Sequence, residues 1–374
     1  SHVRMEGVSM FGITGSGGAL AGTLTECTVE YCSASGVEME SADSEQGGGR
    51  LALGGLLGRA ESSTVQRCFV SDLLLTARAG SVAGGIGGLA GYLTGNGGKL
   101  QECYAQGTID SSFSGIGGLV GISGNSISQV WTDVSVRSSA SGIGGILGSA
   151  EKSLSFKSAF AAGEVYSQTG SLDNVGRLYG NELGNAVVTA SRIYAYEGQL
   201  MNGQSVTDRL DALALLSIED LSGSSVRAGW SRRLGMGSGW QIQGTDSPEV
   251  TPGMLPWLLD EDGVNPLPGQ SVTILRDLSL VLNPIQYEAP INSGDPYKLY
   301  VSFVQPMADS LYEYGSTVIE GMEVARPSEE YPLDLFTQES SADGTVTTNF
   351  VLYTWLNSYQ DNYRVTVQVT RADG

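Results

Sequence analysis

A glycine-rich apolar heptapeptide recurs along the first half of this chain and limits what the chain can fold into. It reads GIGGLAG at 85–91, GIGGLVG at 115–121 and GIGGILG at 142–148. Glycine contributes 53 of the 374 residues, but without the every-third-residue spacing that a collagen helix needs. A short motif that returns at a period of about 30 residues indicates a repeat architecture.

Six copies of the heptapeptide can be aligned on their last glycine. Counted by subtraction, the spacings are 36, 33, 30, 27 and 32 residues between Gly22, Gly58, Gly91, Gly121, Gly148 and Gly180. Irregular spacings of this size are typical of a solenoid whose coils differ in loop length. We therefore predict an all-β fold built on a β-solenoid of about six coils.

A second segment, with the mixed apolar and polar pattern of a half-buried strand, follows each heptapeptide. It is clearest at 100–109, which reads LQECYAQGTI. The aligned segments place small or medium apolar residues in one column, predicted to be an inward-facing ladder of Cys27, Cys68, Cys103, Val130, Ala159 and Ile193. In this alignment Cys32 lies outside the ladder.

Stacked coils explain the glycines. Neighbouring coils lie about 4.8 Å apart, so a strand that turns tightly while another backbone approaches it has no room for a Cβ atom. The leucine or isoleucine between the glycines then fills the axis. We predict structural roles for Gly22, Gly58, Gly88, Gly91, Gly118, Gly121, Gly145, Gly148 and Gly180.

The pair formed by GGLVG or GGLAG and a segment such as LQECYAQGTI resembles the GLUG-motif repeat of bacterial surface and secreted proteins. That family includes the noncatalytic repeat region of IgA-peptidase-like proteins. The resemblance covers roughly residues 1 to 200 and implies an extracellular, wall-associated or secreted location. The first copy, with Gly18-Ala19-Leu20, and the sixth, with Arg177 in place of a glycine, depart from the pattern and are predicted to be end coils.

A cap is expected where the repeat pattern stops, after residue 198. Residues 205–216 combine a serine start signal with apolar residues at helical recurrence, which predicts a short helix. Large aromatics follow, and the whole segment resembles the stretch that finishes GLUG-type solenoids, where a cap covers exposed strand edges. We predict a first domain of residues 1–263, with a helical cap at about 199–263 that contains Trp230, Trp240 and Trp257.

Residues 264–374 have a different composition and are predicted to form a second domain. Nine of the sixteen tyrosines lie beyond residue 280, and glycine becomes rarer. Short strand-like runs separated by turn signals predict a small immunoglobulin-like β-sandwich. A fibronectin-like or unclassified sandwich fits equally well, because the cysteines that join antibody sheets are absent. The runs are 271–282, 297–304, 317–324, 332–336, 345–355 and 363–370.

Charge and residue types limit the chemistry. The net charge of −20 argues against nucleic acid or an anionic membrane, because phosphate binding needs basic residues. The lone histidine, His2, resembles a vector-derived residue, which removes serine or cysteine triads and histidine-based zinc sites. The chain contains no run of about 18 apolar residues, so no membrane-spanning segment is predicted. We predict no enzymatic activity and no cofactor.

Cysteines and carboxylates leave alternatives open. The cysteine spacing does not match a zinc pattern, so we predict buried thiols, with a Cys27–Cys68 disulfide as the alternative. Asp260, Glu261 and Asp262 are weak calcium candidates, because hard cations take oxygen ligands. Most acids fall in loop-like stretches, which predicts a solvated acidic face. A paired carboxylate groove would instead indicate a carbohydrate-active solenoid.

The sequence favours a noncatalytic segment of a bacterial surface or secreted protein. A rigid solenoid would serve as a stalk or an adhesin-type binding region for an unknown host or microbial surface ligand, either a glycan or a protein. The alternative is a noncatalytic accessory region of a larger extracellular peptidase or glycan hydrolase, since we interpret the chain as a piece of a longer protein. We expect a monomer.

Overall fold

The computed structural model describes two compact units, residues 1–276 and 277–374. In the first unit the described residues are 3–42, 50–78, 84–169, 171, 173–196, 199, 201, 214–216, 234–241 and 255–270. In the second unit the backbone is described at 286–288, 297–306, 312–319, 323–324, 337–340, 345–355 and 365–371. The described residues contain strands and turns but no helix, so the chain is all-β as predicted.

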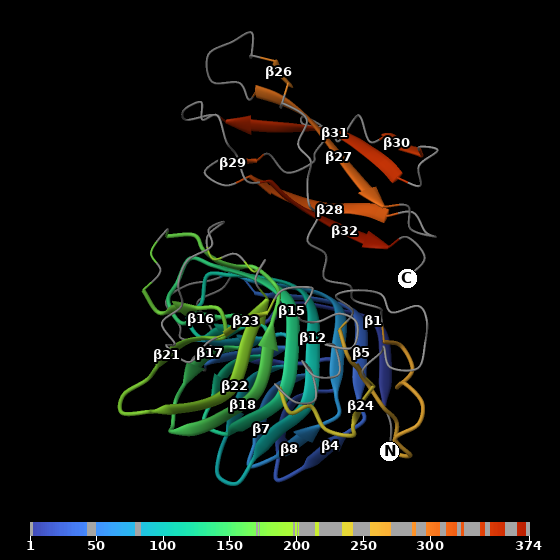
Figure 1. Ribbon diagram of the computed structural model, residues 1–374. Helices are drawn as coiled ribbons and strands as arrows, with labels where there is room; N and C mark the ends of the chain where they lie inside the picture. Colours follow the sequence, from blue (N-terminus) through green and yellow to red (C-terminus); the bar gives the residue numbers. More distant parts are fainter. Residues whose placement is uncertain are drawn as a thin grey trace. The chain divides into compact units, whose positions relative to one another are not determined.

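The first unit is a β-solenoid made of three parallel sheets (Figure 1). The strands of sheet A are β1 (Arg4–Ile13), β4 (Thr28–Glu30), β5 (Ser33–Ser41), β8 (Thr64–Gln66), β9 (Phe69–Ala77), β12 (Lys99–Ser111), β15 (Ser126–Ser138), β18 (Leu154–Ala161), β19 (Val165–Ser167), β22 (Val188–Tyr196) and β23 (Ala214–Leu216).

Sheets B and C are each built from six short strands. Sheet B contains β2 (Ser16–Gly17), β6 (Leu51–Gly54), β10 (Gly84–Gly87), β13 (Ile116–Gly117), β16 (Ile143–Gly144) and β20 (Val175–Gly176). Sheet C contains β3 (Ala21–Thr25), β7 (Leu57–Glu61), β11 (Ala90–Thr94), β14 (Val120–Ser123), β17 (Leu147–Ala150) and β21 (Tyr179–Glu182).

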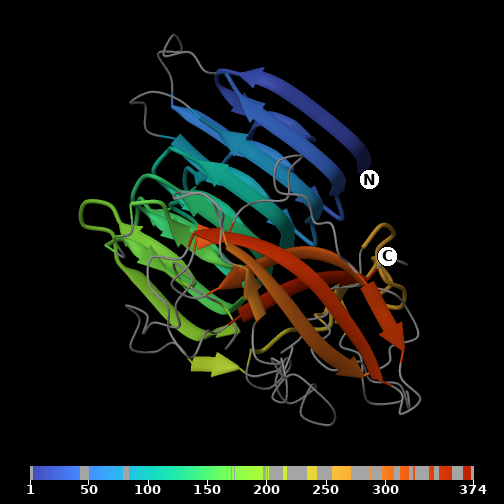
Figure 2. The same ribbon diagram turned by 90° about the horizontal axis from the view of Figure 1, so that it is seen from above.

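One turn of the solenoid passes through sheets A, B and C in that order. Turn one is β1-β2-β3, turn two runs from β4 and β5 through β6 to β7, and turn six ends with β20 and β21. Figure 2 shows the turns following one another along the stack in chain order. The predicted solenoid of about six turns is confirmed, and each heptapeptide is the end of a B strand, a tight turn and the start of a C strand.

Backbone approaches backbone at the glycines. A Cβ atom on Gly118 would lie 2.1 Å from the carbonyl oxygen of Gly145 in the next turn. On Gly121 it would lie 2.2 Å from the amide nitrogen of Ile86 in sheet B. Real Cβ atoms do not come this close to backbone, so these positions admit glycine alone. Similar backbone contacts, between 2.1 and 2.6 Å, surround Gly22, Gly58, Gly88, Gly91, Gly145, Gly148 and Gly180.

Aliphatic side chains between the glycines fill the axis. They belong to the main core cluster, which draws on all three sheets. Fully buried members from the heptapeptides are Ile86, Leu89, Ile116, Leu119, Ile143 and Ile146. Burial of a branched aliphatic side chain contributes about 1.5–3 kcal/mol, so a column of them holds the stack together along its whole length.

The sixth copy closes the interior differently from the others. Arg177 stands where other copies have glycine and is 1% exposed. Its guanidinium donates to the carbonyl oxygen of Gln199, and the Gln199 amide donates to Gly163 O at 2.8 Å and to Arg177 O at 3.2 Å. Turns one and six hold the edge strands of sheets B and C, as predicted for end coils.

The prediction of a helix at 205–216 is wrong for its last three residues. Residues 214–216 form strand β23, which pairs in parallel with β22, and Tyr196 lies opposite Leu216. Leu215 is 44% exposed while Leu216 is buried, which is the alternation of a strand. The open edge of β22 offers unpaired backbone groups, and pairing with them overrides the local helical pattern. Residues 205–213 lie outside the described residues.

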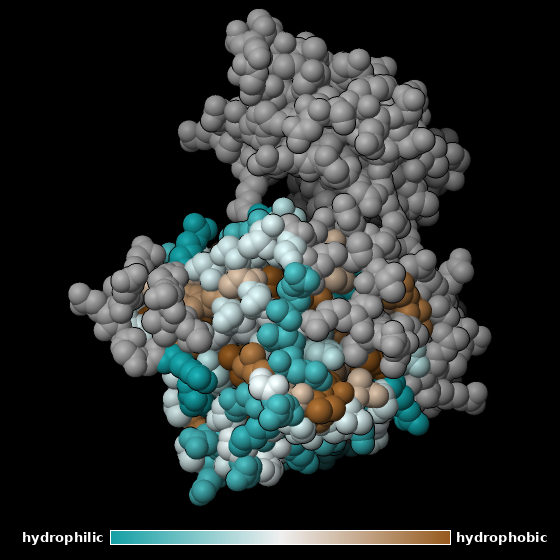
Figure 3. All heavy atoms as spheres, turned by 90° about the vertical axis from the view of Figure 1, so that its left-hand side faces the viewer, coloured by the Kyte–Doolittle hydropathy of each residue, from teal (hydrophilic) through white to brown (hydrophobic). Residues whose placement is uncertain are grey.

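The turn-six end carries apolar side chains at its surface. Figure 3, which views the molecule from that side, shows brown apolar atoms between teal polar ones. The exposed large apolar residues of this end are Leu183, Val187 and Leu215.

The second unit contains two antiparallel sheets. One has the order β26 (Gln286–Glu288), β27 (Tyr297–Pro306), β31 (Thr345–Trp355) and β29 (Glu323–Val324), with β30 (Thr337–Ser340) also on β31. The other pairs β28 (Tyr312–Ile319) with β32 (Val365–Arg371). Strands fall within or across the predicted runs 297–304, 317–324, 345–355 and 363–370, while 271–282 and 332–336 lie outside the described residues. The unit boundary after 276 is later than the expected one after 263, because residues 264–270 belong to the first unit.

Candidate functional site

In six successive turns, sheet A is interrupted at the same point by a residue in the left-handed backbone region. The φ angles are between 51° and 55° at Tyr31, Arg67, Glu102, Gln129, Ser158 and Arg192. The side-chain types are unrelated, so the backbone conformation is set by the stacking rather than by a residue preference. We call these six residues the polar column. The residue after each member of the polar column belongs to a ladder on the inner face of sheet A, and the residue after that belongs to a ladder on the outer face.

The ladder that follows on the inner face is nearly the predicted one. Cys103 lies opposite Val130, Val130 opposite Ala159 and Ala159 opposite Ile193, all in register and buried. Cys68 precedes Cys103 in the stack, since Phe69 lies opposite Tyr104. The prediction for Cys27 is wrong: Cys27 is exposed, and Cys32 occupies the ladder position.

The error has a simple cause. The repeat pattern is matched in the sequence by Leu24-Thr-Glu-Cys27. In the structure, however, the segment that pairs with 65–68 is Val29-Glu-Tyr-Cys32, because Val29 lies opposite Val65. The Cys32 amide donates to the Cys68 sulfur at 3.4 Å. All four cysteines are thiols in the structure. Side chains related by a translation of about 4.8 Å keep their Cβ atoms farther apart than the 3.5–4.5 Å of a disulfide.

An aromatic ladder covers the outer face of sheet A, one residue beyond the inner ladder. Phe69 and Tyr104 stack with ring centroids 5.0 Å apart and planes at 5°, and Tyr104 and Trp131 stack at 4.2 Å and 8°. Phe160 and Tyr194 continue the register. This ladder was not predicted, although an aromatic residue follows the aligned column in five successive segments.

A non-repeating segment lies across this ladder. We call residues 234–241 and 255–270 the strap. It contains the short antiparallel pair β24 (Trp240–Gln241) and β25 (Trp257–Leu258), and β24 lies over sheet A in Figure 1. Trp240 packs against Tyr104, with centroids 6.3 Å apart. The buried Trp131 indole donates to Pro256 O at 3.1 Å. The ladder and the strap share one apolar cluster.

The predicted cap is therefore divided: Gln199 and strand β23 do lie on the last turn, whereas its two described tryptophans have a different place. Trp240 lies on the side of the stack, against turn four, and Trp257 beside it in β25 is half-buried. Neither covers the end of the solenoid. The tryptophans pack on the outer face of sheet A because this face offers apolar aromatic surface along several turns. A cap at the end of the stack would bury the apolar surface of the last turn only. Trp230 lies outside the described residues.

The polar column contacts the strap through side chains. Arg67 Nε lies 2.8 Å from Glu102 Oε2, an ion pair with a largely buried carboxylate, and Glu102 beside Arg67 raises the pKa of that guanidinium. Gln129 Oε1 accepts from the Gly237 amide at 2.7 Å. Hypothetical Cβ atoms on Gly235 and Gly239 would collide with Arg192 and Glu102.

Polar groups next to the aromatic ladder are incompletely satisfied. Within the described part of the chain, Ser71 Oγ, Tyr104 OH and Gln106 Oε1 are buried without a hydrogen-bond partner. Burial raises the pKa of Tyr104 well above its usual value, and burial raises the pKa of Asp133, opposite Gln106, to about 6. Buried unpaired groups cost about 1–3 kcal/mol each, so this row weakens the outer face.

The geometry of the aromatic ladder limits what it can bind. Sugar rings are held on aromatic faces, but the faces of Phe69, Tyr104 and Trp131 are occupied by one another in the stack. Their outer edges are covered by the strap. The arrangement is suited to packing rather than to recognition of a small molecule.

The calcium candidates form a turn. Asp260 Oδ1 accepts from the amide of Val264 at 3.0 Å, and Oδ2 accepts from the Asn265 side chain at 3.0 Å. These hydrogen bonds hold the pKa of Asp260 below its usual value. Among the described residues no group of three histidine, cysteine or acidic side chains is placed to hold a metal ion.

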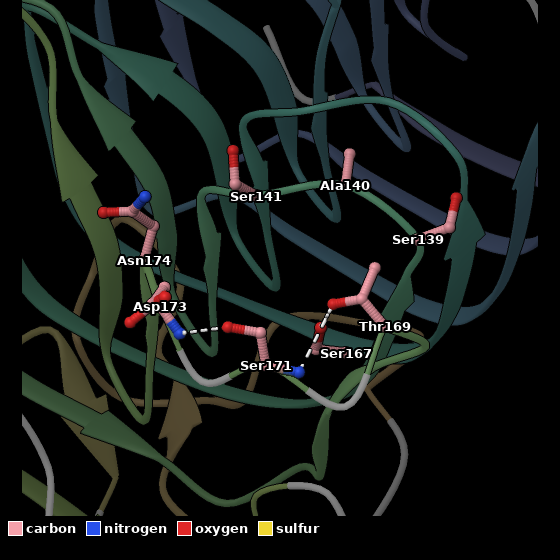
Figure 4. A pocket seen from close by; sticks show the side chains of 8 residues that line it. All are labelled: Ser139, Ala140, Ser141, Ser167, Thr169, Ser171, Asp173 and Asn174. Atoms are coloured by element: carbon pink, nitrogen blue, oxygen red, sulfur yellow. Dashed lines mark hydrogen bonds between the residues drawn. The ribbon is translucent and has the colours of Figure 1, made fainter.

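A small polar hollow lies at the corner between sheets A and B. Figure 4 shows Ser139, Ser141 and Thr169 on its rim. The Ser167 and Thr169 hydroxyls are 2.9 Å apart, and the Ser171 hydroxyl accepts from the Asp173 amide at 3.1 Å. These hydrogen bonds lie within the hollow, which is a surface depression lined mainly by hydroxyl groups.

Comparisons with protein-family models, with curated proteins and with solved structures find no match to this chain. In the portion of the chain that the structure describes, no helix is long and apolar enough to cross a membrane.

Proposed function

We propose that this chain is a noncatalytic segment of a bacterial surface or secreted protein, in which the solenoid serves as a rigid scaffold or an adhesin-type binding region. The observation that carries the proposal is the contact between backbones at the glycine columns, with Gly118 against Gly145 O as the example. Because these contacts have no side chains to rearrange, the stack resists bending and shear. Stiffness of this kind suits a part that holds other surfaces in place.

The use of the outer face supports the same proposal. The aromatic ladder, the largest set of stacked rings among the described residues, contacts the chain's own strap. Its aromatic surface stabilises the scaffold itself. Contact with a ligand would then fall to loops and corners, such as the hollow around Ser141 and Thr169.

Four finer assignments belong to this proposal. We assign the coils to the GLUG type on the heptapeptide and its following strand, and we place the protein outside the bacterial cell on that resemblance. We assign the second unit to the immunoglobulin-like sandwiches on its two antiparallel sheets. The partner is a surface ligand of host or microbe, either a glycan or a protein.

The test is a glycan-array and extracellular-matrix binding screen on the full chain. Saturable binding supports the adhesin-type role, and a Thr169→Val, Asp173→Ala variant tests the hollow as the contact point. Absence of binding overturns the adhesin version and retains the scaffold. Mass spectrometry on the same glycans and proteins after incubation checks the noncatalytic assignment, which any catalytic turnover would overturn.

A further inference from the structure

The strap runs along the stack in the reverse of chain order, from the last strands of sheet A toward the first. Gly235 lies against Arg192 in β22, Gly237 against Gln129 in β15, and Gly239 against Glu102 in β12. Near its other end, Gly269 lies against the guanidinium of Arg4 in β1. The chain therefore leaves the last strands of sheet A and returns to the first.

Apolar residues and glycines alternate along the strap, and each kind lies over a different row of sheet A: the aromatic ladder or the polar column. Leu234 and Met236 are buried in the aromatic cluster. On the glycines between and after them, a Cβ atom would lie 2.4 Å from Arg192 at position 235, 2.9 Å from Gln129 at 237 and 2.9 Å from Glu102 at 239. The strap thus presents apolar side chains to the aromatic ladder and bare backbone to the polar column.

Hydrogen bonds fix the strap at two points. The Gly237 amide donates to Gln129 Oε1 at 2.7 Å, and the Trp131 indole donates to Pro256 O at 3.1 Å. The Gln270 side chain then closes the strap on itself, accepting from Leu258 N at 2.7 Å and donating to Leu258 O at 2.9 Å.

We propose that the outer face of sheet A is an interaction surface for the chain's own strap, and that this interaction mounts the solenoid by one end. Residue 4 and residue 269 both lie beside turn one, and turn six is the opposite end of the stack. The inference deepens the proposed scaffold role, on which it rests: the chain enters and leaves the solenoid at the turn-one end rather than at opposite ends. An in-line exit at β22 would lie about 29 Å away, which is six strand spacings.

A distance measurement tests this proposal in the full chain. Nitroxide labels are placed at Glu6→Cys and Pro268→Cys, both exposed positions, with Cys27→Ser to remove the exposed native thiol. We expect a narrow distance distribution well short of about 29 Å. A distance as long as the stack would overturn the proposal.

A strap variant supplies the second arm. Gly235→Val with Gly239→Val places side chains against Arg192 and Glu102, and position 235 also has a φ of 68°, which a β-branched residue rarely adopts, so we expect the distance between the labels to lengthen and broaden. Gly15→Val is the control, because a Cβ atom there meets nothing within 4 Å. A label pair at the exposed Thr108 and Lys157 checks that the coils remain folded.

The outcomes separate the two proposals. An unchanged distance between positions 6 and 268 in the strap variant, with the coils folded, would overturn the role of the polar column. A longer distance with an intact stack supports it. Neither result depends on the ligand screen. The attachment of the solenoid by its turn-one end and the binding role can therefore fail independently, and each has its own test.

Discussion

Two interfaces hold the first unit together, and they make opposite demands on sequence. Between sheets B and C, backbone lies against backbone, as at Gly121 beside Ile86 N. Between sheet A and the strap, side chain lies against side chain, as at Trp240 beside Tyr104. The first interface accepts one residue type at each position, whereas the second accepts any residue that fills the space. Repetition is therefore visible in the first and hidden in the second.

The largest effect should come from the backbone interface. Gly118→Ala places a methyl group 2.1 Å from Gly145 O, and we expect a loss of more than about 4 kcal/mol of unfolding free energy, or no folded protein. Gly124→Ala in the same turn meets only the side chains of Glu151 and Lys152, at 3.1 Å or more, and is the matched control. Denaturant unfolding measures both. Equal stabilities would remove the distinction between the two interfaces.

A smaller but still large loss is expected at the side-chain interface. Trp131→Ala removes the ring stacked on Tyr104 and the donor to Pro256 O, and should cost about 3–4 kcal/mol. Trp131→Phe retains a stacked ring and loses the hydrogen bond, at about 1–2 kcal/mol. Thermal unfolding of both variants measures this graded response, which the glycine columns should not show. A Phe variant as unstable as the Ala variant would contradict it.

On the inner face of sheet A, alkaline pH should weaken the fold. Burial raises the pKa of Cys68 well above its ordinary value, and the hydrogen bond with Cys68 raises the pKa of Cys32. The folded state then holds protons that the unfolded state releases above about pH 8.5, so stability falls as pH rises from there. For one thiol the loss is about 2 kcal/mol by pH 10.

Cys68→Val is the variant for that measurement, because Val130 fills the same ladder position two turns on. Unfolding free energies recorded between pH 7 and pH 10 should fall less steeply for this variant than for the parent. An unchanged slope would assign the alkaline loss to other groups.

The smallest effect is expected at the outer face. Burial raises the pKa of Asp133 to about 6 from an ordinary value of about 3.9, so its contribution to stability is lost as pH rises from about 4 to about 6. Asp133→Asn removes the charge. Because Asp133 is half-buried, we expect a discounted gain of about 1–2 kcal/mol at pH 7 and none at pH 4. A loss of stability at pH 7 would show that the carboxylate has a partner.

The repeat interface could be predicted from sequence because its cause is local. A glycine is required wherever a backbone approaches, so the position of Gly121 is glycine in all six copies and that of Gly118 in the four inner copies. The inner ladder was predictable for Cys68 and Cys103 on the same grounds. Cys27 was misplaced because two overlapping segments of turn one fit the pattern, and only the pairing of Val29 with Val65 decides between them.

The outer interface could not be predicted in the same way. The aromatic ladder is visible in the sequence, since Phe69, Tyr104 and Trp131 each directly follow a residue of the inner ladder. The polar column left none, because residues as different as Arg67 and Ser158 adopt the same left-handed conformation. The path of the strap depends on contacts between segments more than 100 residues apart, such as Gly237 with Gln129, and no periodicity encodes such a contact.

The strap has a consequence for how this chain can evolve. Solenoids ordinarily gain or lose a repeat at little cost, because each coil touches only its neighbours. Here, one coil inserted between β15 and β22 would move Arg192 about 4.8 Å away from Gly235 while Gln129 stayed beside Gly237. A duplication or deletion would therefore succeed only together with a matching change in the strap. The non-repeating segment fixes the number of repeats.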